Sequence, residues 1–221
     1  MNNFMASSKS RQITYFAVLT ALTTVLQLVG NTARIGIVTL NFSLVPIVIA
    51  GLLLGAIYGA ALGAITGLII LLNNGVLGAD GFTNVLFATD PVVIILVCIL
   101  KTAVAGGVCA FVYKAFKDKN EYLGVFVSSA IVPIINSGLF ALGMFLIVPS
   151  LIEVGFMAEG DNAFAVVILG LIGLNFVFEL ALNLIVAPAI YRVVRIVDKN
   201  FSAPDTHIEE TVTEEKDEGD K

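Results

Sequence analysis

Apolar residues dominate this chain, and polar residues interrupt them at intervals that suit membrane helices. The longest apolar stretch, residues 35–79, has 45 residues without Asp, Glu, Lys, Arg or His. As one helix it would be roughly 68 Å long at ~1.5 Å per residue. A bilayer core is about 30 Å thick and takes about 20 apolar residues per crossing. The stretch therefore suits two crossings, and the glycines within residues 55–59 permit a tight turn between them.

The same pattern along the whole chain predicts an all-α integral membrane protein with six transmembrane helices. Residues 73–89 read as a long polar loop, and residues 114–121 read as a charged connector. Pro91 suits the start of a helix, and Pro149 suits the end of one. The predicted spans are residues 12–29, 37–54, 56–72, 91–113, 122–148 and 163–191.

The charged residues divide the chain and orient it. We predict a cytoplasmic lead over residues 1–10, a six-helix membrane domain over 11–196, and an acidic disordered cytoplasmic tail over 197–221, which is too polar to pack. Cytoplasmic loops carry an excess of Lys and Arg. Six crossings leave Arg34 alone on the outer face, so the sequence predicts a multi-pass protein of the cell membrane with both termini cytoplasmic. The basic residues then sharing the inner face are Lys9, Arg11, Lys114, Lys117, Lys119, Arg192, Arg195 and Lys199.

Composition agrees with this class. The chain is 58% hydrophobic and 13% charged, whereas soluble domains are roughly 45–50% apolar and about 25% charged. The net charge of −5 comes from the tail, since eight acidic groups lie in the last 17 residues. No basic surplus indicates nucleic acid. Cys98 and Cys109 lie about 16 Å apart along one predicted helix, which is too far for a disulfide, so both read as buried small residues.

Small residues recur every four positions on two of the predicted helices. Gly55, Gly59, Gly63 and Gly67 form such a line, which lets another backbone approach closely. We favour packing within the chain for this line. Two small residues on the first span, at positions 17 and 21, have the same spacing. On spacing alone, packing within the chain is again favoured over a docking face for another membrane protein.

Several polar residues lie inside the predicted spans. A charge at the bilayer centre costs about 2.5–3.5 kcal/mol, so such groups usually face a cavity or a partner. One hypothesis pairs Lys101 with Glu179 across two helices. The alternative is a cavity in which Lys101 meets an anionic ligand and amides orient it, while hydrogen bonds between helices account for Asn183 and Ser129. The polar residues in question are Lys101, Ser129, Asn136, Ser137, Asn175, Glu179 and Asn183.

Depth in the membrane separates these residues into two groups. From the outer helix ends, Lys101 lies about 16 Å deep and Glu179 about 24 Å deep. We therefore predict a substrate site in the outer half, and we interpret Glu179 and Asn183 as structural or coupling residues. Asparagines in the outer loops suit a lid over that site, or simply solvated loop ends. The predicted substrate-binding residues are Asn41, Asn73, Asn74, Asn84, Lys101, Asn136 and Asn175.

The motifs of common enzymes and ATPases are not present in the sequence. It has no G-x-x-x-x-G-K-(S/T) phosphate loop, so ATP-driven work needs another subunit. The only histidine, His207, lies in the tail, which argues against an intramembrane metalloprotease or a histidine-dependent serine protease. We expect no enzyme, no metal site and no cofactor bound by this chain.

Three segments together resemble a known family. TLNFSLVPIVIAGLLLG (39–55), VPIINSGLFALGMFL (132–146) and GLNFVFELALNLIVAPAI (173–190) are similar to the substrate-specific S component of energy-coupling factor (ECF) vitamin transporters. The likeness covers about residues 12–195. It implies a six-helix membrane protein that captures a vitamin or vitamin precursor from outside for uptake. It also implies the partners, a transmembrane coupling protein and two cytoplasmic ATPase subunits that use ATP.

The resemblance also bears on individual residues. In the family, an A-x-x-x-A pair on helix 1 docks the coupling protein. Ala17 and Ala21 match this pair, which favours docking over packing. The family's substrate site lies near the outer face, lined by helices 4–6 and the loops after helices 1, 3 and 5. That location agrees with the site residues predicted above.

The substrate and the class of transporter have alternatives. The segments look most like the branch with pantothenate carriers, and Lys101 suits a carboxylate as a compact point charge. Folate also carries carboxylates, whereas riboflavin does not, and the scarcity of Trp and Tyr disfavours a large flat ring. We choose pantothenate. The alternative function is a stand-alone proton-coupled secondary transporter of a small organic anion, with Glu179 as proton relay, although the internal repeats common in such transporters are not evident.

Overall fold

A computed structural model describes residues 2–32, 34–35, 38–39 and 41–202 of the chain. This part is helical apart from one short antiparallel pair, β1 (Arg34–Ile35) with β2 (Val38–Thr39). The α-helices are α1 (Asn2–Gly30), α2 (Leu44–Leu54), α3 (Ala56–Ile70), α4 (Gly81–Thr89), α5 (Pro91–Lys117), α6 (Glu121–Leu146), α7 (Val148–Glu153) and α8 (Leu174–Ser202). Two π-helices, η1 (Leu71–Val76) and η2 (Ala165–Gly173), continue α3 and lead into α8.

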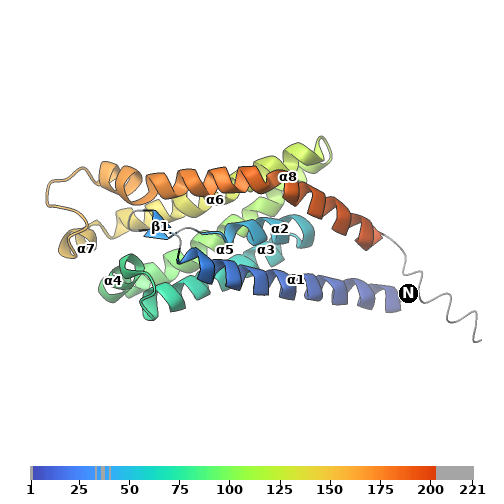
Figure 1. Cartoon of the computed structure of the whole chain (residues 1–221), viewed down its shortest axis with the longest axis horizontal. Helices are drawn as coiled ribbons and strands as arrows, with labels where there is room; N and C mark the ends of the chain where they lie inside the picture. The colour runs from blue at the N-terminus through green and yellow to red at the C-terminus, as the bar shows by residue number, and fades with distance from the viewer. Residues whose placement is uncertain (1, 33, 36–37, 40, 203–221) are drawn as a thin grey trace, which may run out of the picture.

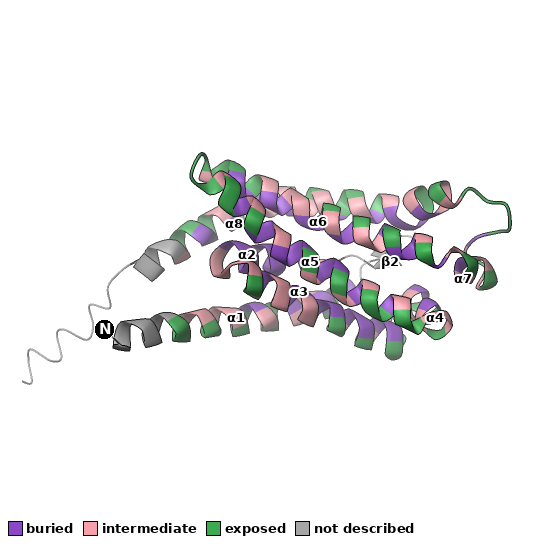
Figure 2. Cartoon of the chain, turned by 180° about the vertical axis from the view of Figure 1, so that it is seen from behind, coloured by how far each residue is buried: buried purple, intermediate pink, exposed green. Residues whose placement is uncertain are grey.

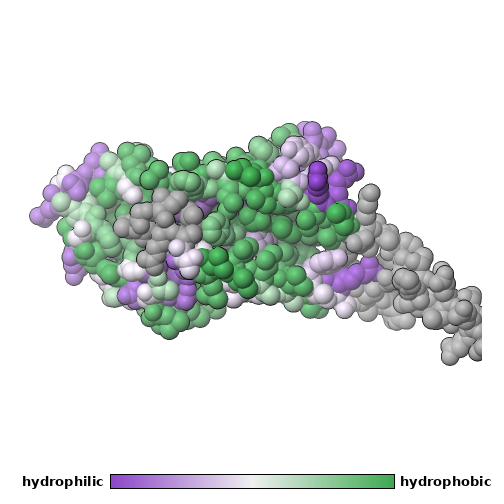
Figure 3. All heavy atoms as spheres, in the orientation of Figure 1, coloured by the Kyte–Doolittle hydropathy of each residue, from purple (hydrophilic) through white to green (hydrophobic). Residues whose placement is uncertain are grey.

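The long helices form an elongated bundle (Figure 1). The start of α1 and the end of α8 lie at one end of it, and α4 and α7 lie at the other (Figure 1). Among the described residues, five helices are long and apolar enough to cross a membrane, and α2 is a shorter apolar helix. The surface is apolar over the middle of the bundle and hydrophilic toward both ends (Figure 3). This is the arrangement of a multi-pass membrane protein.

Of the described residues in the predicted second span, 37–54, only those from Leu44 onward are helical. The helix α2 has 11 residues, roughly 16 Å at 1.5 Å per residue, which is about half of a bilayer core. Leu44, Ile47 and Val48 are completely buried, because α2 packs against α1, α3, α5 and α8 inside the bundle. Hydropathy does not distinguish such a core helix from a span that faces lipid.

The turn that follows α2 was predicted from its glycines and is shorter than expected. Gly55 has a φ of +92°, a backbone conformation that favours glycine, and α3 begins at the next residue. The fold-back therefore takes one residue rather than residues 55–59, and Gly59 is part of the helix.

Internal packing of the glycine line is confirmed for Gly59, Gly63 and Gly67. A Cβ atom on any of these three would lie 2.1–2.4 Å from a backbone oxygen of α5. The hydroxyl of Thr102 on α5 donates a hydrogen bond to the carbonyl oxygen of Gly63 at 2.7 Å. Close backbone contact of this kind is how membrane helices associate without a hydrophobic drive.

The predicted loop over residues 73–89 is wrong, because η1 and α4 occupy most of it. The side chain of Asp80 accepts a hydrogen bond from the backbone N–H of Thr83 at 3.1 Å and so caps α4. Phe82 and Leu86 of α4 are buried against the bundle. Short capped helices contain the same Gly, Asn and Asp residues as loops, which is why polarity alone suggested a loop.

Other element ends differ from the prediction by a few residues. The helix α5 continues to Lys117, which shortens the connector, and Pro149 lies in the first turn of α7 rather than ending the fifth span. The helix α8 continues to Ser202, past the predicted membrane-domain limit at residue 196. The rest of the predicted tail, residues 203–221 with His207, lies outside the described residues, as do the side chains of Arg34 and Lys199. Both cysteines are free and buried in α5, as predicted.

Candidate functional site

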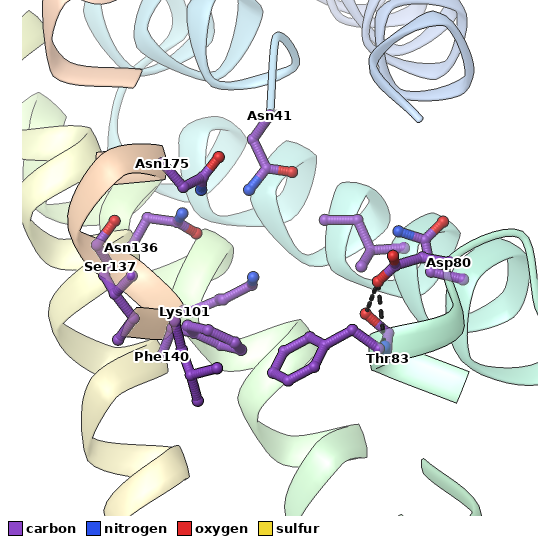
Figure 4. Close-up of a pocket in the computed structure, with 13 residues that line it drawn as sticks. Asn41, Asp80, Thr83, Lys101, Asn136, Ser137, Phe140 and Asn175 are labelled. Carbon is purple, nitrogen blue, oxygen red and sulfur yellow. Dashed lines mark hydrogen bonds between the residues drawn. The ribbon is translucent and has the colours of Figure 1, made fainter. Parts of the chain in front are cut away.

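A polar cavity lies inside the bundle beside α4, which contributes Phe82 and Thr83 to its lining (Figure 4). Both π-helices contribute to its wall, and π-helical segments are frequent at functional sites. The lining residues are Asn41, Ile70, Asn74, Asp80, Phe82, Thr83, Lys101, Asn136, Ser137, Phe140, Leu171, Ile172 and Asn175.

Lys101 is the cation of this cavity. Its side chain projects from α5 and is only 8% exposed. The ammonium lies 4.7 Å from the centre of the Phe140 ring on α6, which is a cation–π contact. Within the part of the chain that the structure describes, no hydrogen bond or ion pair reaches the Lys101 ammonium. The hypothesis of a direct Lys101–Glu179 ion pair is therefore wrong.

Amide groups lie beside Lys101 on the same side of the cavity (Figure 4). Asn136 projects from α6 and Asn175 from α8, and both are buried. The Oδ1 atoms of both side chains are buried, and no group in the described part of the chain forms a hydrogen bond with them. Buried polar atoms are normally paired, so these two acceptors suit a ligand that donates hydrogen bonds.

Glu179 lies outside the cavity and accepts hydrogen bonds from two of the asparagines that line it. Its Oε1 accepts one hydrogen bond from Asn175 Nδ2 at 2.9 Å and another from the backbone N–H of Asn41 at 3.3 Å. The carboxyl group is 1% exposed and does not line the cavity with Lys101. Glu179 thereby ties the segment before α2 to α8.

The interpretation that Asn183 and Ser129 form hydrogen bonds between helices is wrong. Asn183 Nδ2 donates to the backbone oxygen of Glu179 at 2.9 Å, and Ser129 Oγ donates to the backbone oxygen of Val125 at 2.8 Å. Both bonds stay within one helix. Hydrogen bonding between helices is therefore not what these side chains provide.

Asp80 and Thr83 form the opposite side of the cavity (Figure 4). Asp80 is 1% exposed. Its Oδ2 accepts hydrogen bonds from the backbone N–H and the hydroxyl of Thr83, while its Oδ1 is buried and has no hydrogen-bond partner among the described residues. The cavity thus presents a carboxylate across from an ammonium.

The residues predicted for the site divide into two groups. The structure brings together Asn41, Asn74, Lys101, Asn136 and Asn175 around the cavity. The other two support it from outside. Asn73 Nδ2 donates to Asn74 Oδ1 at 3.3 Å, and Asn84 Nδ2 donates to the Gly75 carbonyl oxygen at 2.7 Å.

The sequence reasoning missed several lining residues, of which Asp80 matters most. Asp80 followed by Thr83, ahead of the apolar Phe82 and Leu86, has the spacing of an N-cap before a short amphipathic helix, and this signal was available. Ser137 adjoins the predicted Asn136. No sequence signal separates the two phenylalanines of the wall from the other 13 in the chain.

The donor set suits an organic ligand. Over the described residues, no group of three or more His, Cys, Asp or Glu side chains comes together to hold a metal ion. The cavity instead combines one ammonium, one carboxylate and several amides. These groups can bind and orient a small polar molecule.

Comparison with known proteins adds one match. The family model for the ECF transporter substrate-specific component matches residues 11–191. Neither the curated proteins nor the solved structures gave a match to this chain.

Proposed function

Because this chain belongs to the family of ECF transporter substrate-specific components, we propose that it captures a vitamin or vitamin precursor outside the cell for import. Membership makes the chain a component of a transporter and not an enzyme. One observation carries the proposal of ligand capture. A buried cavity holds the ammonium of Lys101, which no acidic side chain pairs among the residues described, next to unpaired amide oxygens.

Pantothenate is the vitamin that this set of groups favours. Lys101 offers one point charge for its carboxylate, and the orphan oxygens of Asn136 and Asn175 offer acceptors for its hydroxyl and amide donors. Riboflavin has no carboxylate to meet Lys101. Folate has two, and the cavity wall contains one basic side chain.

We propose six crossings in total, with the short helix α2, enclosed by the other helices, as the second. Both termini are then cytoplasmic, and the cavity faces outward. The start of α1, the turn between α5 and α6, and the end of α8 lie at one end of the bundle (Figure 1). Exposed basic residues gather there, as cytoplasmic ends require. They include Lys114, Lys117, Arg192 and Arg195.

Cysteine labelling tests this orientation. In a Cys98→Ala/Cys109→Ala background, a membrane-impermeant maleimide added to intact cells should label Glu159→Cys and leave Asp118→Cys unlabelled. Both positions are exposed. Asp118 lies in the turn between α5 and α6, and Glu159 follows α7, which lies at the opposite end of the bundle (Figure 1). Permeabilised cells, in which both should react, provide the control. Strong labelling at position 118 in intact cells would reverse the orientation.

We further propose that α1 docks the transmembrane coupling protein, which carries two cytoplasmic ATPases. Ala17 and Ala21 are exposed on α1, so they do not pack within the chain, and much of the outward side of this helix is uncovered (Figure 2). Small residues at this spacing let a second membrane helix approach closely. The two positions also match the docking pair that the resemblance implies.

Co-purification and uptake test the function and the docking face together. The tagged chain should co-purify with a coupling protein and ATPases, and vitamin uptake should require ATP. Ala17→Leu/Ala21→Leu should abolish co-purification, because the larger side chains hold the partner helix away. Ala181→Leu/Ala189→Leu on exposed positions of α8 is the matched control and should retain it. Uptake by this chain alone, driven by an ion gradient, would reject the proposal in favour of a secondary transporter.

A further inference from the structure

We infer that the ligand carries a single anionic group, which binds the Lys101 ammonium, and hydrogen-bond donors at its other end, which donate to the Asp80 carboxylate. This inference rests on the proposed function and names the substrate class of the same cavity. Figure 4 shows the two charged side chains on opposite sides of the space, with Asn136 and Asn175 on the side of Lys101. The structure forms no ion pair between Lys101 and Asp80 among its described residues, so neither charge neutralises the other by contact.

Only one of the two carboxylate oxygens of Asp80 accepts hydrogen bonds from described residues of the protein. Oδ2 accepts both hydrogen bonds from Thr83 and fixes the start of α4. Oδ1 is buried and has no partner, in a side chain that is 1% exposed and lines the cavity. An unpaired buried acceptor is costly. A hydroxyl or N–H group of the ligand would satisfy it.

The balance of charges limits the ligand to one anionic group. A second carboxylate at the Asp80 end would face a like charge in a partly buried site, where such repulsion is stronger than in water. Of the described side chains that line the cavity, three have a buried acceptor atom without a hydrogen-bond partner, namely Asp80 Oδ1, Asn136 Oδ1 and Asn175 Oδ1. The ligand class is therefore a small monoanion with several hydroxyl or amide N–H groups. Dianions and ligands without a carboxylate fall outside it.

Asp80→Asn isolates the unpaired oxygen. Asparagine is as good an N-cap as aspartate, so its carbonyl oxygen keeps the bonds from Thr83 and the helix start. The amide nitrogen then replaces Oδ1, which turns an acceptor into a donor at the cavity wall. The matched control is Asp161→Asn. Asp161 Oδ2 caps an exposed loop by accepting from the Ala158 N–H at 2.8 Å, and it does not line the cavity.

The experiment measures dissociation constants of the purified full chain for two probes, pantothenate and N-(3,3-dimethylbutanoyl)-β-alanine. The second probe keeps the carboxylate and the amide and lacks both hydroxyls. The wild type should bind pantothenate about tenfold more tightly than the analogue. Asp80→Asn should weaken the binding of pantothenate about tenfold and barely change the affinity for the analogue, as expected in a double-mutant cycle if Asp80 contacts the hydroxyls. Asp161→Asn should change neither.

Three results would overturn the inference. Equal affinity of the wild type for the two probes would do so without any variant. An equal loss of affinity for both probes in Asp80→Asn would show that Asp80 has only a structural role. Tighter binding of folate or riboflavin than of pantothenate would place the ligand outside the monoanion class. In each case co-purification with the coupling protein and ATPases still decides the proposed function by itself.

Discussion

Gly63→Ala is expected to lower the free energy of unfolding by about 3 kcal/mol or more, which is the upper range for overpacking. The new Cβ atom would lie 2.1 Å from the backbone oxygen of Thr102 and 2.8 Å from the Cα atom of Ala103. Backbone atoms cannot turn aside as a flexible side chain would, so α3 and α5 must separate. Separation also breaks the hydrogen bond from the Thr102 hydroxyl to the Gly63 carbonyl oxygen.

Gly138→Ala is the matched control for this change. Gly138 lies in α6 and is exposed, and a Cβ atom added there would meet open space, with no neighbouring group within 4 Å. Alanine should be neutral or stabilising there, by up to about 1 kcal/mol, because it is the better helix former. Thermal unfolding of detergent-purified protein, followed by size-exclusion chromatography, measures both variants. Equal melting temperatures for Gly63→Ala and the wild type would contradict the close packing of α3 on α5.

Lys101→Met is expected to weaken the binding of pantothenate at least tenfold, or about 1.4 kcal/mol. Methionine keeps the length of the side chain and its contact with Phe140 but removes the charge that meets the carboxylate. Hydrogen bonds to charged groups contribute about 1.5–3 kcal/mol, so a larger loss is within reach. The ligand-free protein should be at least as stable as the wild type, because a buried unpaired cation in a membrane helix is costly.

Two controls make this result specific. Lys114→Met removes an exposed charge at the opposite end of the bundle and should leave affinity unchanged. Panthenol, in which a hydroxymethyl group replaces the carboxylate, should bind Lys101→Met and the wild type equally. Calorimetry or thermal shift measures both. A ligand at about 100 times its dissociation constant adds about 2.7 kcal/mol of stability. Unchanged affinity of Lys101→Met for pantothenate would remove Lys101 from the site.

Helix existence and most of the polar site followed from local patterns. Runs of apolar residues predicted the five long spans, since a bilayer core demands a minimum length. The cost of an intramembrane charge made Lys101 a site residue. Asn136 and Asn175 followed because amides inside spans are rare and face inward. All three line one cavity. The reason is that exposing any of these polar side chains to lipid is costly, so each faces the interior of the bundle.

Only the tertiary structure decided which apolar helix is enclosed and which polar groups meet. It placed α2 inside the bundle, where hydropathy had suggested a full span, since burial by protein and burial by lipid select the same residues. It left Lys101 and Glu179 without a direct ion pair among the described residues and set Asp80 across the cavity from Lys101, because these positions depend on how α4, α5 and α8 pack. Sequence alone determined a membrane protein with a cation in its interior. The packing of helices far apart in the chain determined what that cation faces.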